Sequence, residues 1–368
     1  MRKVDTMKQR GALPPHGGDI EAFEARYGRR PLDFSVNTNP YGLSPAARAA
    51  AIAALAHADR YPDPRCRALA AALAERNGVA VGGVLVGNGA TDVLFRLIRA
   101  LSPRKALVCA PTFSEYERAC ARVGCRVEVH PLDPACGYRL DEGILDKLEG
   151  VDVAFLCEPN NPTGQVDDPT LLRRVLERCG EVGCLLVVDE CFNGFLAEPG
   201  KASLRGLVAD HPQLAVIDAF TKTHGMAGLR LGYALCSDAD LIVRAWEAGV
   251  PWSVSVIAQE AGCAALADEE HIERARTLIA RERPRLEEGL LAAGFDIIPS
   301  QANYLTARAP VADLPARLAR AGIMVRDCGT YDGLPDRCVR FAVRLPEENS
   351  RLIEAVHEAV AEAKCEEA

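Results

Sequence analysis

Several features are scarce or missing in this 368-residue sequence, and each absence excludes a class of protein. Acidic residues outnumber basic ones, 51 to 43, and the formal net charge is −8 at pH 7. Because neither a net basic balance nor a block of lysine and arginine is present, we do not expect nucleic acid or an anionic membrane as a partner. A membrane-spanning helix needs a run of about eighteen apolar residues, and none occurs. We therefore expect a small-molecule partner.

The 14 cysteines do not follow the pattern of a metal site. CxxC is absent, and the pairs Cys120/Cys125 and Cys179/Cys184 are too loosely patterned for zinc ligands. Free cysteine behaves as a small buried hydrophobe, which explains most of them, so we expect no metal and no disulfide framework. Residues 1–15 are charged and lack the apolar segment of a signal peptide. We expect a soluble, reduced, cytoplasmic protein.

Short apolar runs alternate with helical patterns through the middle of the chain. The runs are 106–110, 126–130, 151–157, 184–190 and 214–220. Helical patterns lie between most of them, for example at 114–123, 140–149 and 169–179. Apolar strands buried on both faces and separated by helices are typical of a mostly parallel sheet. We predict an α/β fold whose large domain spans residues 45–250.

The two ends of the chain follow different patterns. Ser44 and Pro45 have the residue types of a helix cap and a first helical position, so a helix is predicted to begin there. A long helical region, 254–293, leads to short apolar strands that alternate with helices. We predict that residues 251–368 hold a linking helix and a smaller α+β domain, and that residues 1–44 form an arm and part of that domain.

Four strand ends carry polar or aromatic residues that need an explanation. Gly89 and Ala90 form a turn into a helix, where free N–H groups favour a phosphate. Phe113 and Asn161 follow two further strands, and Asp189 ends the strand in "VVDE". When each is taken alone, a tight turn explains the first equally well, a core ring explains Phe113 better, and a proline turn also accounts for Asn161. The buried carboxylate, however, requires a cation or an N–H donor.

A lysine in the segment "AFTKTHGMAGLRLGYAL" completes this set. The amine of Lys222, held near apolar walls, can lose its proton and form an imine with a carbonyl compound. Together the strand ends offer a phosphate cradle, a stacking ring, an amide, a carboxylate and a nucleophilic amine. These are the groups that pyridoxal 5'-phosphate needs, a cofactor that serves as an electron sink for amino acids.

The order of "NPTG", "VVDE" and "TKTHGMAGLRLGY" resembles the fold-type I, aspartate-aminotransferase-like family of pyridoxal-phosphate enzymes over about residues 16–362. The resemblance implies a mostly parallel sheet of the seven-stranded type, wrapped by helices, with a smaller α+β domain. It makes Lys222 the imine-forming lysine, Asp189 the partner of the ring nitrogen and Asn161 the donor to the phenolic oxygen. Phe113 is then the stacking ring.

The same resemblance implies contacts to the cofactor phosphate and a subunit arrangement. The phosphate contacts are Gly89, Ala90, Thr221 and Arg230. Ala219 replaces a serine or threonine with which many relatives hold the cofactor phosphate. Thr221 or Thr91 is therefore expected to contribute more to holding it. Tyr61 in "YPDP" is expected to reach the cofactor phosphate of a neighbouring subunit, which implies a homodimer.

Within the family, four segments resemble the threonine-phosphate decarboxylases of cobalamin biosynthesis more than the histidinol-phosphate aminotransferases. They are "HGGDIEAF", "NTNPYG", "VPWSVSVIAQ" and "VRDCGTYDGL". Phe192 also stands where the aminotransferases usually have a tyrosine. This likeness puts Arg340 on the substrate carboxylate and His16, Gly17, Asn39 and Arg326 at its phosphate. The aminotransferase activity, serine phosphate as the substrate, and a non-catalytic sensor or scaffold remain as alternatives.

Overall fold

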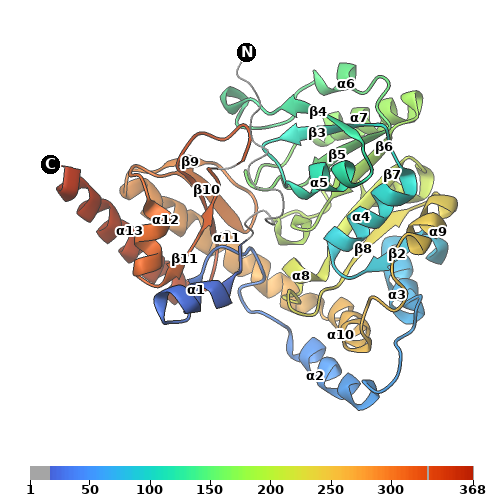
Figure 1. Ribbon diagram of the computed structural model, residues 1–368, viewed down its shortest axis with the longest axis horizontal. Coiled ribbons are helices and arrows are strands. Elements are labelled where there is room, and N and C mark those ends of the chain that lie inside the picture. Colours follow the sequence, from blue (N-terminus) through green and yellow to red (C-terminus); the bar gives the residue numbers. More distant parts are fainter. Residues whose placement is uncertain (1–16, 330, 368) are drawn as a thin grey trace.

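The computed structural model describes residues 17–329 and 331–367 of the chain (Figure 1). A seven-stranded sheet occupies the middle of the sequence, and a four-stranded sheet lies near its C-terminal end. A separate pair of short strands joins the N-terminal segment to the C-terminal part of the chain. None of the helices in the described ranges is long and apolar enough to cross a membrane.

The large sheet is mixed but mainly parallel. Its strands are, in spatial order, β2 (Val84–Gly87), β8 (Gly232–Cys236), β7 (Leu214–Ala219), β6 (Leu185–Asp189), β5 (Val153–Cys157), β3 (Lys105–Ala110) and β4 (Arg126–Pro131). β8 runs antiparallel to both of its neighbours, and every other pair is parallel. The predicted α/β fold with a mostly parallel sheet is confirmed.

Side chains alternate along the strands and enter two separate apolar cores, one on each face of the sheet. In β6, Leu186 and Val188 belong to one core, whereas Leu185 and Val187 belong to the other. The first core is covered by α3 (Arg67–Asn77), α7 (Pro169–Val182) and α10 (Val256–Leu266). The second is covered by α4 (Ala90–Leu101), α5 (Glu115–Arg122) and α9 (Ala239–Glu247). Burial on both faces explains why these strands read as continuous apolar runs.

The remaining elements of this part are all helical. They are the α-helices α2 (Pro45–Ala54), α6 (Ile144–Lys147) and α8 (Phe220–Thr223) and the 3-10 helices η1 (Leu55–His57), η2 (Val81–Gly83), η3 (Pro134–Cys136), η4 (Asn193–Phe195) and η5 (Arg205–Asp210). The Oγ of Ser44 accepts a hydrogen bond from the N–H of Ala47, and Pro45 is the first residue of α2, as the sequence predicted.

The smaller sheet is antiparallel and packs against long helices. Its spatial order is β12 (Arg326–Asp327), β13 (Cys338–Ala342), β10 (Tyr304–Arg308) and β9 (Asp296–Ile298). Figure 1 shows this sheet in orange and red beside α11 (Glu269–Ala292), α12 (Leu314–Arg320) and α13 (Pro346–Glu367). These elements share a third apolar core.

The N-terminal segment joins this smaller part. It contains α1 (Ile20–Tyr27) and β1 (Leu32–Asp33), and β1 pairs in parallel with β11 (Ile323–Met324). The buried Phe34 donates its N–H to the carbonyl of Met324 and accepts the N–H of Ala342. Residues at the start of the chain are therefore bonded to strands near its end. The domain boundaries at residues 44 and 250 remain a prediction.

Candidate active site

A cavity of about 620 Å³ lies where strands of the large sheet end, facing the smaller sheet. Cys157, Asp189 and Ala219, the last residues of β5, β6 and β7, line it. Arg326 and Arg340 line it from β12 and β13. In open parallel sheets, ligands bind beyond the carboxyl ends of the strands, so the position of the cavity is that of a ligand site.

Most of the site residues predicted from the sequence meet in this cavity. Those that line it are Gly17, Ala90, Thr91, Phe113, Asn161, Asp189, Thr221, Lys222, Arg230, Arg326 and Arg340. They come from segments far apart in the chain, and no local pattern in the sequence requires them to converge. Their convergence is a property of the fold.

The amine of Lys222 lies in an environment that favours its neutral form. Lys222 belongs to α8, which begins directly after β7. Burial lowers the pKa of this amine from 10.5 to about 8, and the nearby charges of Arg340 and Arg230 contribute in the same direction. The Nζ atom lies 5.5 Å from the centre of the Phe192 ring. Near neutral pH a useful fraction of this lysine is therefore a nucleophile.

The carboxylate of Asp189 is buried, and its hydrogen-bond partners are neutral groups. Its Oδ1 accepts the N–H of Cys191 at 3.0 Å, and its Oδ2 accepts the hydroxyl of Tyr116 at 2.8 Å. Burial raises the pKa of Asp189, although both hydrogen bonds oppose that shift. No lysine, arginine or histidine of the described segments forms an ion pair with it. A carboxylate held in this way at a cavity wall is suited to a cationic N–H group of a ligand.

The N-terminus of α4 forms a place for an anion. Gly89 precedes this twelve-residue helix with φ of +90°, and no side chain caps the free N–H groups. A Cβ atom at Gly89 would lie 2.7 Å from Nη2 of Arg230, so glycine is needed for this guanidinium to approach. Thr91 and Thr221 line the cavity as well. Helix N–H groups, hydroxyls and a guanidinium together suit a phosphate.

Arg340 reaches the cavity from the smaller sheet and is tied to the large one. Its Nη1 bonds to Oδ1 of Asn161, and its Nη2 donates to the carbonyl of Ser35 at 3.0 Å. Its guanidinium lies 5.4 Å from the centre of the Tyr304 ring. These contacts fix the orientation of the guanidinium, which then faces the cavity beside Lys222.

Three predicted residues lie outside the lining of the cavity. Gly89 stands just behind it, as described above. Asn39 is buried, and its Nδ2 donates to the carbonyl of Thr223 while its N–H donates to the carbonyl of Lys222. Its predicted contact with a substrate phosphate stays a prediction. Tyr61 is 82% exposed and contacts Trp252. His16 lies outside the described residues.

Gly17 lines the cavity, and a larger residue would not fit at this position. A Cβ atom there would lie 2.4 Å from the carbonyl oxygen of Ser35, the same oxygen that accepts the Arg340 bond. The glycine therefore lets the N-terminal segment approach the wall of the cavity closely. The predicted contact of Gly17 with the substrate phosphate stays a prediction.

Several lining residues were not predicted from the sequence. They are Gly18, Ser35, Val36, Thr38, Glu115, Arg118, Cys157, Cys191, Phe192, Ala219, Ala227 and Tyr331, of which Phe192 and Ala219 had been noted only as departures from a family pattern. Tyr116, which holds Asp189, was also missed. Its signal was its place in the helix that directly follows Phe113, since a buried tyrosine hydroxyl normally finds a partner.

The residues fit pyridoxal 5'-phosphate on these observations. Asp189 can accept the N–H of the pyridinium ring, Phe113 can stack on it, and Asn161 can reach the phenolic oxygen. The start of α4 with Arg230 can hold the phosphate, and the amine of Lys222 can react with the aldehyde. Among the residues described, no group of three or more His, Cys, Asp or Glu side chains is arranged to bind a metal ion.

Comparison with known proteins gives the family. The aminotransferase class I and II model matches residues 29–356. The chain is 35% identical over 348 residues to a threonine-phosphate decarboxylase of Salmonella typhimurium, covering 93% of this chain and 95% of that protein. It is 36% identical over 370 residues to a histidinol-phosphate aminotransferase of Symbiobacterium thermophilum, covering 98% of this chain and all of the other (100%).

A solved structure has the same fold. The histidinol-phosphate aminotransferase from Sinorhizobium meliloti, in complex with pyridoxal-5'-phosphate, superposes with a TM-score of 0.84. The match covers 95% of this chain and 96% of that chain at 24% identity. The chain belongs to the aminotransferase class I and II family, and its cofactor is pyridoxal 5'-phosphate.

Proposed function

We propose that this enzyme removes the carboxyl group of L-threonine O-3-phosphate. The products are carbon dioxide and (R)-1-amino-2-propanol O-2-phosphate, which serves the nucleotide loop of cobalamin. The observation that carries the proposal is the pair of guanidinium groups, Arg326 and Arg340, that line the cavity with Lys222. A phosphorylated amino acid brings two anions, and the planar fork of arginine suits both carboxylate and phosphate. The decarboxylase relative supports the same reaction.

Phe192 gives a second argument for the decarboxylase. Its ring lies 5.5 Å from Nζ of Lys222 and packs edge-on against Tyr304, with 5.1 Å between the ring centres. In the aminotransferases the tyrosine at this place adds a hydroxyl that bonds the phenolic oxygen. Here the position contributes only an apolar wall. We infer that Asn161 alone supplies this hydrogen bond.

The residues have separate tasks in this reaction. When bound, the cofactor supplies an electron sink for the pair left on Cα after the bond to the carboxylate breaks. Arg340 holds the carboxylate before it leaves, and orientation of that bond decides which reaction follows. Asp189 keeps the ring nitrogen protonated. Lys222 then delivers a proton to Cα, which replaces the carbon dioxide that has left.

Histidinol-phosphate aminotransferase is the second candidate. The relative from Symbiobacterium thermophilum favours it, because the match at 36% identity runs along 98% of this chain. It uses the same cofactor site and a phosphorylated substrate but transfers an amino group. Serine phosphate in place of threonine phosphate would also fit a decarboxylase, since one methyl group changes binding by only about 1–3 kcal/mol.

Paired assays separate these activities. The holoenzyme is given threonine phosphate or serine phosphate, and carbon dioxide and the product amines are measured by mass spectrometry. In parallel it is given histidinol phosphate with 2-oxoglutarate, and glutamate is measured. We expect carbon dioxide from threonine phosphate and little glutamate. Stoichiometric glutamate without carbon dioxide would show that the enzyme is the aminotransferase.

A matched pair of variants tests the role of Arg340. Arg340→Lys keeps the charge but loses the fork, and we expect kcat/KM for carbon dioxide release to fall ~100-fold. Arg337→Lys changes an exposed arginine next to the same strand and should stay within about twofold of the unmodified enzyme. Equal activity of the two variants would show that Arg340 does not bind the substrate carboxylate.

A further inference from the structure

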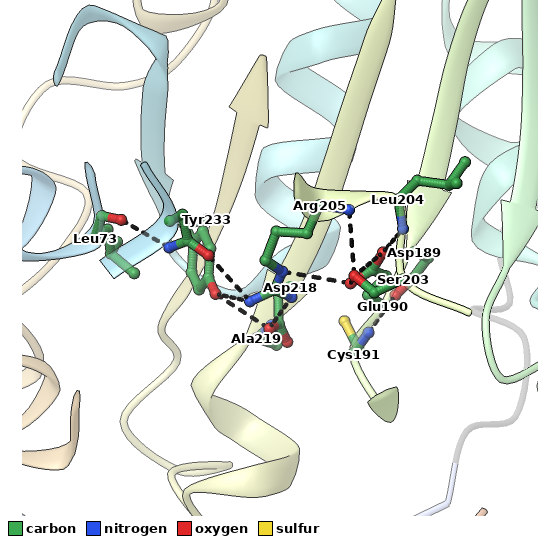
Figure 2. A network of polar contacts seen from close by, with 11 residues as sticks. Leu73, Asp189, Glu190, Cys191, Ser203, Leu204, Arg205, Asp218, Ala219 and Tyr233 are labelled. Carbon is green, nitrogen blue, oxygen red and sulfur yellow. Dashed lines mark hydrogen bonds and ion pairs between the residues drawn. The ribbon is translucent and has the colours of Figure 1, made fainter. Parts of the chain in front are cut away.

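Two carboxylates, one buried and one partly buried, stand directly beside the cofactor-holding residues, and neither lines the cavity. Glu190 follows Asp189 at the end of β6, and Asp218 is the next-to-last residue of β7. Glu190 is 1% exposed. Four residues after Asp218 comes Lys222. Figure 2 shows that one arginine, Arg205 of η5, lies between the two carboxylates.

The contacts of Arg205 bridge the two strands. Its Nη2 lies 2.7 Å from Oδ2 of Asp218, and its Nε lies 3.3 Å from Oε2 of Glu190. Its Nη1 donates to the hydroxyl of Tyr233 on β8 at 2.9 Å. Because three nitrogen atoms of one planar group each meet a different partner, the arrangement fixes the relative positions of β6, β7 and β8.

The carboxylates are also held by other donors. Glu190 accepts the hydroxyl of Ser203 at 2.9 and 2.8 Å and the N–H of Leu204 at 3.0 Å. Asp218 accepts the hydroxyl of Tyr233 at 3.1 Å and the N–H of Ala219 at 2.6 Å. Hydrogen bonds thus hold both groups in place, while Arg205 supplies the cation that compensates their charge.

The network lies immediately behind the strand ends that carry Asp189 and Lys222. Asp189 pairs with Ile217 in the sheet, and the N–H of Glu190 donates to the carbonyl of Ile217 at 2.8 Å. The bond from Ala219 to Asp218 fixes the backbone at the point where β7 turns into α8. A shift of either carboxylate would therefore move the residues that face the cofactor.

We propose that Arg205 is a positioning residue for the cofactor, which holds Asp189 and Lys222 in their relative places by clamping Glu190 and Asp218. Arg205 touches neither substrate nor cofactor. The proposal depends on the cofactor and not on which substrate the enzyme uses. Without Arg205, the buried Glu190 and the partly buried Asp218 would lose their shared cation, and the ends of β6 and β7 would separate or take up water.

Arg285 in α11 offers a matched control. Its Nη1 lies 3.1 Å from Oε2 of Glu282, a buried carboxylate of the smaller part of the molecule. Arg285→Met therefore also removes one cation from a buried carboxylate, which keeps Arg281 at 3.1 Å, but away from the cavity. It should destabilise the protein without changing how the cofactor is held.

The test compares Arg205→Met, Arg205→Lys and Arg285→Met as full-length proteins. The dissociation constant of pyridoxal 5'-phosphate is measured by equilibrium dialysis, and the visible circular dichroism per bound cofactor reports its orientation. Urea unfolding of the apoproteins gives their stability. We expect Arg205→Met to raise the dissociation constant ~10- to 100-fold and to reduce the dichroism. Arg205→Lys should recover part of both, and Arg285→Met should leave both within about twofold.

Unchanged affinity and dichroism in Arg205→Met would overturn the proposal. So would equal losses in Arg205→Met and Arg285→Met at equal apoprotein stability, since a general loss of stability would then explain both. If Arg205→Met does not fold, Arg205→Lys and Tyr233→Phe decide the matter. The second variant removes the hydroxyl that joins Arg205 to Asp218 and should raise the dissociation constant ~2- to 5-fold. No change in either variant overturns the proposal.

Discussion

The hydroxyl of Tyr116 donates a 2.8 Å hydrogen bond to Oδ2 of Asp189. Tyr116 is buried in α5, where its ring stacks on Phe155 with 5.2 Å between the ring centres. The same ring meets Phe113 edge-on at 5.7 Å. The helix that follows the proposed stacking ring therefore also holds the proposed partner of the ring nitrogen, which couples the two contacts to the cofactor.

Tyr116→Phe should weaken the hold on the cofactor. The hydrogen bond from Tyr116 lowers the pKa of Asp189, although burial raises it more. Its removal favours the protonated carboxyl group, which cannot pair with a cationic ring nitrogen. We expect the dissociation constant of pyridoxal 5'-phosphate, measured by dialysis, to rise about tenfold, since such a bond contributes ~1–2 kcal/mol. Tyr138→Phe, which alters a buried tyrosine outside the cavity, is the control and should not change it.

The uptake of cofactor by the apoenzyme should depend on pH through Lys222. The amine reacts only when neutral, and burial lowers its pKa to about 8. Below that pH the neutral fraction falls tenfold for each unit of pH, so the rate of cofactor attachment should fall with it. Above about pH 8 the rate should level off. A rate that keeps rising toward pH 10, as for an ordinary lysine, would contradict the lowered pKa.

Tyr61 should act across a subunit interface. It is 82% exposed, and its ring lies 4.8 Å from that of Trp252. Other exposed apolar residues include Ile52, Leu55 and Val250. We expect a homodimer in sedimentation experiments, because such side chains favour burial against a partner.

Mixed dimers test this directly. Subunits carrying Tyr61→Ala and subunits carrying Lys222→Ala are unfolded together and refolded. If Tyr61 serves the neighbouring subunit, one site of each mixed dimer has both residues, and activity should appear that exceeds the sum of the two variants alone. Additive activity, or a monomer in sedimentation, would disprove the shared site.

The fold was largely predictable because its strands are buried on both faces. The apolar runs at 106–110, 184–190 and 214–220 correspond to β3, β6 and β7. The predicted helix at 140–149 is only the four-residue α6, Ile144–Lys147. β8 was not predicted, since its five residues follow a glycine-rich segment and carry no clear alternation. Its antiparallel direction depends on pairings far along the sequence.

The candidate site was predictable where a residue type has a chemical reason to occur. A buried aspartate needs a donor, and a glycine turn before a helix suits a phosphate, so Asp189 and Gly89 could be proposed as candidates from the sequence. Arg205 could not, because it lies in a 3-10 helix without a motif, and its partners Glu190 and Asp218 are 28 positions apart (218 − 190). The role of the Tyr116 hydroxyl becomes apparent only in the folded structure, where it donates to Asp189 at the end of β6.

One measurement addresses the central claim, that Lys222 carries the cofactor. The holoenzyme is reduced with borohydride, digested, and its peptides are sequenced by mass spectrometry, with Lys222→Ala treated in the same way. We predict a pyridoxyl-phosphate group on Lys222 and no modified peptide from the variant. A group attached to another lysine, or unmodified peptides from a protein saturated with the cofactor, would contradict the assignment.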